Sequence, residues 1–84
     1  MDARRKKIHY RAWHRGMREM DLILGRFADQ TLEKMDAEHL DDFERVLDCP
    51  DHMLLGWITG RDDVVPEFNN EFMGLLKRFH AIPE

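Results

Sequence analysis

The sequence predicts an all-α protein, a compact bundle of five short helices. Its 84 residues include only five glycines and three prolines, and valine, isoleucine and threonine are few, which favours helices over strands. Apolar residues recur three and four positions apart along most of the chain, the period of an amphipathic helix. We expect one domain over residues 1–84, with a basic arm at residues 1–7 that frays because so short a helix is marginal without packing.

The first two helices are expected over about residues 3–14 and 18–34. The first has a short apolar face, and the second has a longer one made of Met20, Ile23, Leu24, Phe27, Thr31, Leu32 and Met35. Gly25 lies inside the second helix, where glycine costs up to about 1 kcal/mol relative to alanine, so we expect a close helix crossing there. Gly16 stands between the helices and is expected in a turn, at a helix C′ position, or at a close backbone approach.

Caps and breaks define the remaining three helices. Asp36 can cap the third helix, which ends before Pro50 because the residue preceding a proline avoids the α conformation. Asp51 is expected to cap the fourth helix, over about residues 52–59, and Gly60 to end it. Pro66 suits the first position of the last helix. The apolar face of that helix is Phe68, Phe72, Leu75, Leu76 and Phe79.

Composition argues against several classes of function. The single cysteine excludes an intrachain disulfide and a paired-cysteine zinc site. None of the five histidines has another histidine three or four residues away, so we expect no metal site. No nucleophile and base pair or glycine-rich phosphate loop occurs, and we therefore expect no catalytic residue and no enzyme activity. No apolar run approaches the length of a membrane span, and no signal peptide is recognisable.

Charge is unevenly distributed along the chain. Residues 1–18 hold seven basic residues against one acidic residue, whereas the whole chain has a net charge of −4. Such a dipolar chain can bind an acidic surface of another protein. It can also bind nucleic acid through the cations at residues 4–7, although a pI of about 5.7 is low for a protein in which phosphate binding dominates.

A segment at the junction of the first two helices has the composition of a binding surface. Residues 15–19, which we call the recognition segment, are Arg15, Gly16, Met17, Arg18 and Glu19. Two cations and a carboxylate beside a glycine can make ion pairs and hydrogen bonds with a partner protein. Trp13 and Asp21 flank the segment and are further candidates for partner contact, although Trp13 serves equally well as a core residue.

These residues resemble a known family. The recognition segment is followed by Met20-Asp21, Phe27, Phe43, Val46-Leu47-Asp48, Pro50-Asp51 and Leu54-Leu55-Gly56-Trp57-Ile58-Thr59-Gly60. In this order and spacing they closely resemble the FAD assembly factors of succinate dehydrogenase, the small flavinator proteins of bacteria and mitochondria. The similarity covers about residues 8–79. It departs from the family pattern at Met20, where leucine is frequent, and at Gly56, where an acidic or amide residue usually precedes the tryptophan.

The resemblance implies a five-helix assembly chaperone. Such a protein binds the flavoprotein subunit of succinate dehydrogenase, and in some bacteria that of fumarate reductase, and promotes covalent attachment of FAD to a histidine of that subunit. Arg15, Gly16 and Glu19 would engage the flavoprotein, with Met17 and Arg18 as neighbours. We expect a monomer in the bacterial cytoplasm that binds no FAD stably. The alternative is a small nucleic-acid-binding or regulatory module that uses residues 4–7.

Overall fold

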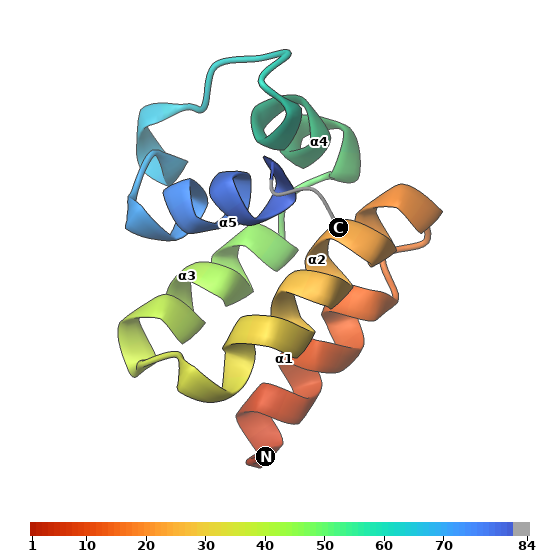
Figure 1. The fold of residues 1–84 in the computed structure, drawn as a ribbon, viewed down its shortest axis with the longest axis vertical. Helices are drawn as coiled ribbons and strands as arrows, with labels where there is room; N and C mark the ends of the chain where they lie inside the picture. The colour runs from red at the N-terminus through yellow and green to blue at the C-terminus, as the bar shows by residue number, and fades with distance from the viewer. Residues whose placement is uncertain (82–84) are drawn as a thin grey trace.

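The computed structural model describes residues 1–81, which form five α-helices and two 3₁₀ helices of one turn each (Figure 1). The elements are α1 (Ala3–Trp13), α2 (Arg18–Thr31), η1 (Leu32–Lys34), α3 (Ala37–Leu47), α4 (Asp51–Thr59), η2 (Pro66–Phe68) and α5 (Glu71–Ala81). The predicted all-α bundle of five helices is confirmed. The second helix ends at Thr31 rather than Lys34, because the chain tightens there into η1. None of the described helices is both long and apolar enough to cross a membrane.

One aromatic cluster lies at the centre of the core. The ring of Phe27 on α2 contacts those of Phe43, Phe72 and Phe79, with ring centroids 5.5 to 5.7 Å apart. These partners belong to α3 and α5, so the cluster joins three helices. Helices α1 and α2 lie side by side as a hairpin, and α3 packs against both α1 and α5 (Figure 1). The tilted and edge-to-face arrangement of the rings adds to the stabilisation from burial alone.

Three helix termini depend on local signals visible in the sequence: the start of α3, the end of α4 and the start of α1. The carboxylate of Asp36 accepts the backbone N–H of His39 at 2.9 Å and caps α3 as predicted. Gly60 ends α4 with a φ of +82°, in the left-handed region that favours glycine. Asp2 caps α1 by accepting the backbone N–H of Arg5 at 2.8 Å, and this bond holds the pKa of Asp2 below its ordinary value. The basic residues expected in a frayed arm therefore lie in a capped helix from Ala3 onward.

Two predicted helix starts are wrong. Pro50, not Asp51, is the N-cap residue of α4, and Asp51 is its first helical residue. Pro66 begins the separate turn η2, and α5 starts only at Glu71. The side chain of Asn70 accepts a backbone N–H from the first turn of α5, so Asn70 supplies the capping interaction. A proline in a first turn fits a short 3₁₀ helix as well as an α-helix, which is why the sequence did not distinguish them.

The close crossing predicted at Gly25 is confirmed. A Cβ atom placed on Gly25 would lie 2.2 Å from the indole ring of Trp13, so the ring of α1 covers the bare backbone of α2. The indole N–H donates to the carboxylate of Asp29 at 3.2 Å. Trp13 is half-buried, whereas Trp57, predicted to be a core residue, is only 4% exposed. Gly25 therefore allows the α1–α2 hairpin to close on a large side chain.

Candidate partner-binding site

Gly16 lies in the turn between α1 and α2, as one of the three sequence interpretations predicted. Its φ is +95°, in the region that residues with a side chain rarely adopt. A Cβ atom placed there would meet no heavy atom within 4 Å, so no neighbouring atom of the chain requires the glycine. The backbone dihedral angle alone requires it. The backbone at Gly16 is exposed, which leaves the space above it open to another protein.

The guanidinium of Arg15 points into the molecule. Its Nε donates to the carboxylate of Asp51 at 2.8 Å, and its other two nitrogens donate to the backbone carbonyls of Leu47 and Cys49. The side chain of Arg15 is only 11% exposed and that of Asp51 19%. Because Leu47 is the last residue of α3, a cation there also satisfies the negative end of that helix. Arg15 thus ties the α1–α2 turn to the α3–α4 junction.

A second carboxylate fixes the same turn from the other side. Oδ1 of Asp21 accepts the backbone N–H of Arg15 at 2.6 Å, and the backbone N–H of Asp21 donates to the carbonyl of Met17 at 3.0 Å. Asp21 is half-buried, and the side chain of Met17 packs partly against the core. Asp21, which was a candidate for partner contact, therefore has a role within the chain, because it holds the recognition segment in one conformation.

The part of the recognition segment that faces solvent consists of Gly16, Arg18 and Glu19. Among the described residues, the side chains of Arg18 and Glu19 have no ion-pair or hydrogen-bond partner. Both lie in the first turn of α2, where a carboxylate is favoured by the positive end of the helix. This surface can offer a partner a carboxylate, a guanidinium and an uncovered stretch of backbone. Sequence reasoning found these residues but did not separate them from the inward-pointing Arg15.

The arginines of the N-terminal segment hold α1 to the rest of the bundle. Arg4 binds the carboxylates of Asp41 and Glu44 on α3, and this pairing raises its pKa above the ordinary value. Arg5 binds the Asp2 carboxylate and two backbone carbonyls around η1. Of the four cations at residues 4–7, only the two lysines lack a carboxylate partner in the part of the chain that the structure describes. In the nucleic-acid alternative, only Lys6 and Lys7 would then bind phosphate without first giving up a carboxylate partner.

The described residues form no cluster of three or more histidine, cysteine or acidic side chains that could hold a metal ion. Cys49 is half-buried beside the recognition segment, and burial raises the pKa of its thiol. A thiol that stays protonated near neutral pH is a poor nucleophile. The groups that this site exposes are a backbone turn and two charged side chains, which can make hydrogen bonds and ion pairs with another protein.

The sequence profile of a family described as a flavinator of succinate dehydrogenase matches residues 6–80. An FAD assembly factor from Acetobacter pasteurianus is 42% identical over 59 residues, which cover 70% of this chain and 54% of that protein. A mitochondrial succinate dehydrogenase assembly factor 2 from Dictyostelium discoideum is 37% identical over 73 residues, covering 87% of this chain and 52% of that protein. A mitochondrial succinate dehydrogenase assembly factor 2 from Aedes aegypti is 32% identical over 79 residues, covering 92% of this chain and 49% of that protein.

This chain spans about half the length of the curated relatives it matches. These relatives are named as assembly factors and not as enzymes. No solved structure matches the chain.

Proposed function

Because the chain belongs to the family of flavinators of succinate dehydrogenase, we propose that it is an assembly factor that binds the flavoprotein subunit of this enzyme and promotes covalent attachment of FAD. The observation that carries the proposal is the recognition segment itself. Gly16, Arg18 and Glu19 are exposed on a turn that Arg15 and Asp21 hold in place.

A preformed turn suits recognition of a partner. Since Arg15 and Asp21 already fix the turn, little conformational entropy is lost when it binds. The open space at Gly16 admits the backbone of the flavoprotein, and Glu19 offers its carboxylate to a cation or amide there. Arg18 supplies the second charge. In this proposal Arg15 acts by positioning the contact residues and does not itself touch the partner.

The chain promotes flavinylation by holding its client in a reactive geometry. A domain of the immature flavoprotein that moves freely keeps its histidine and the isoalloxazine ring misaligned for most of the time, and fixing that domain raises the rate of bond formation. The flavoprotein carries out the covalent step itself. The assembly factor then needs no catalytic residue and no stably bound FAD, and it works as a monomer.

The flavoprotein of fumarate reductase is a second client under the same mechanism. The bacterial cytoplasm, expected from the sequence, stays a prediction, because the relatives include bacterial and mitochondrial factors.

The test is covalent flavin on the flavoprotein subunit, measured by in-gel fluorescence in cells that lack the endogenous factor. Glu19→Ala should reduce the signal by about tenfold or more, the range for removing one buried charged contact at an interface. Glu33→Ala is the matched control, since Glu33 is also exposed but lies on η1, away from the recognition segment. It should restore full flavinylation.

One stability measurement is the control for this test, and two flavinylation results decide the proposal. Glu19→Ala should lower the stability by no more than about 1 kcal/mol in thermal unfolding, because Glu19 has no side-chain partner among the described residues and loses only its interaction with the positive end of α2. Full flavinylation in cells with no copy of this chain would overturn the proposed function, and full flavinylation with Glu19→Ala would move the contact away from the recognition segment.

A further inference from the structure

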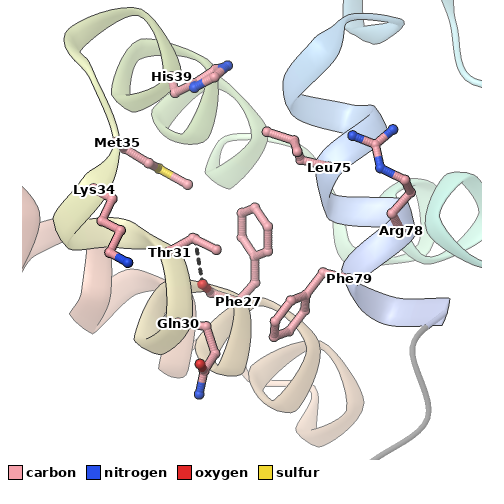
Figure 2. Close-up of a pocket in the computed structure, with 9 residues that line it drawn as sticks. All are labelled: Phe27, Gln30, Thr31, Lys34, Met35, His39, Leu75, Arg78 and Phe79. Atoms are coloured by element: carbon pink, nitrogen blue, oxygen red, sulfur yellow. Dashed lines mark hydrogen bonds between the residues drawn. The ribbon is translucent and has the colours of Figure 1, made fainter.

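A cleft lies at the other end of α2, between the last turns of that helix, η1 and α5 (Figure 2). Its volume is about 410 Å³. Most of its accessible lining is apolar, and Phe27, Met35, Leu75 and Phe79 provide that part of it. The polar lining residues are Gln30, Thr31, Lys34, His39 and Arg78. Thr31 already donates its hydroxyl to the carbonyl of Phe27, so its proton is used within the helix.

The charged side chains of this cleft are all cations. Figure 2 shows Lys34 and Arg78 on opposite sides of the Phe27 and Phe79 rings, one from η1 and the other from α5. No aspartate or glutamate is among the lining residues, although the chain as a whole is acidic. The imidazole of His39 is close to two carboxylates outside the lining, on Asp36 and Glu71. Both carboxylates pair with His39 and with no other cation of the cleft. Lys34 and Arg78 therefore have no ion pair in the described part of the chain.

Unpaired arginines are uncommon in this molecule. Six of them form ion pairs with a carboxylate: Arg4, Arg5, Arg11, Arg15, Arg45 and Arg61. Arg26 is engaged as well. Among residues 1–81 only Arg18 and Arg78 are left, one on the recognition segment and the other at this cleft. An arginine at the edge of an apolar cleft, without a carboxylate of its own chain, can bind the carboxylate of a partner.

We propose that this cleft binds an extended segment of a partner polypeptide in which an apolar side chain is flanked by acidic residues. The apolar side chain packs against the partly exposed Leu75 and Phe79, above the buried ring of Phe27, and the acidic residues pair with Lys34 and Arg78. The cleft is open to solvent, so a small molecule would leave much of its surface in water, whereas pockets for small ligands enclose most of the ligand. A polypeptide passes through an open cleft and buries only the side chain that fits.

The partner rests on the proposed function and is the same flavoprotein subunit. Helix α2 has 14 residues and is about 20 Å long, so the recognition segment at its start and the cleft at its end form two separate contacts. Two contacts on one client raise the overall affinity above that of either alone, because the second forms at a high effective concentration. A client held at two points is also fixed in orientation, as alignment of its histidine and flavin requires.

The first experiment detects the cleft without the client. The ¹⁵N-labelled full chain is titrated with a capped peptide that has phenylalanine and leucine between pairs of aspartates, and amide shifts are followed by NMR. Saturable shifts should appear at Gln30, Thr31 and Phe79. The shifts should be absent when lysines replace the aspartates of the peptide. They should also be absent when the acidic peptide is titrated into the double variant Lys34→Glu and Arg78→Glu.

A matched control variant removes the effect of net charge. Lys7→Glu with Lys77→Glu changes the chain by the same number of charges, and neither residue lines the cleft. This control should bind the acidic peptide as the wild-type chain does. The inference is overturned if the acidic peptide gives no saturable shift, if both variants lose binding equally, or if decanoate fills the cleft while the peptide does not, since the site would then be one for a small amphiphile.

The second experiment uses the flavoprotein subunit without its covalent flavin. The Lys34→Glu and Arg78→Glu variant should bind it about tenfold more weakly than the wild-type chain, and the Lys7→Glu and Lys77→Glu control should differ little from wild type. Equal affinities of the two variants for the flavoprotein would show that the cleft does not contact it. If the wild-type chain does not bind the flavoprotein at all, the proposed function fails, and the peptide titration still decides whether the cleft recognises acidic apolar segments.

Discussion

The replacement of Arg15 by alanine tests whether this residue supports the recognition segment from within or contacts the partner. Arg15→Ala leaves the Asp51 carboxylate without its cation and two backbone carbonyls, on Leu47 and Cys49, without their donors. These acceptors lie at the junction of α3 and α4, far along the sequence from Arg15. The variant should therefore unfold more easily, which a surface arginine would not cause.

The expected magnitude follows from the burial of the pair. Breaking a fully buried ion pair from one side costs roughly 3–5 kcal/mol. Arg15 and Asp51 are 11% and 19% exposed, so water reaches the carboxylate in part, and we expect a loss of about 2–3 kcal/mol. In a domain of this size that corresponds to a fall in Tm of about 10–20 °C. Arg18→Ala removes an exposed guanidinium from the next helix and should change the stability by less than about 0.5 kcal/mol.

The assay is urea denaturation followed by tryptophan fluorescence, with binding to the flavoprotein subunit measured on the same samples below their unfolding midpoints. Arg15→Ala should lose stability, and Arg18→Ala should lose affinity while it keeps its stability. A double-mutant cycle with Asp51→Asn should give a coupling of about 1–2 kcal/mol, since the two residues are in contact. The reasoning is refuted if Arg15→Ala is as stable as Arg18→Ala, because Arg15 would then act through the partner alone.

Three further results are expected. Gly25→Ala should destabilise the chain by about 1–3 kcal/mol, since the new methyl group overlaps the Trp13 indole. A Cβ atom placed on Gly74 of α5 would meet only the Arg78 guanidinium, at 3.5 Å. Gly74→Ala should therefore stabilise the chain by about 0.5–1 kcal/mol in thermal denaturation. Equal effects of the two substitutions would contradict the close crossing at Gly25. Because burial raises the pKa of Cys49, its thiolate fraction at pH 8 should be lower in the native chain than in urea. Iodoacetamide should therefore alkylate the native thiol more slowly, and an equal rate in both states would show that the thiol is not buried.

The helices and some of their limits could be predicted because their signals are local. The apolar period places Phe27 and Phe72 in the core, and Asp36 and Gly60 act through groups within a few residues of themselves. Asp51 shows where this reasoning fails. Its position suits a cap, but its carboxylate is bound by Arg15, which comes from another helix junction. Competition from a distant residue is not visible in a local pattern.

The order of its residues predicts the recognition segment as a binding surface, and this prediction needs the sequence alone. Its division into an exposed part and an inward part was decided by the tertiary structure, because Arg15 reaches its acceptors only when α3 and α4 are folded against the turn. The cleft has the same origin, since Lys34 and Arg78 are distant in sequence and only the packing of η1 and α5 places them on opposite sides of the Phe27 and Phe79 rings. Backbone dihedral angles and helical period are properties of neighbouring residues. The partner of a charged side chain depends on which segments the folded core brings within hydrogen-bonding distance.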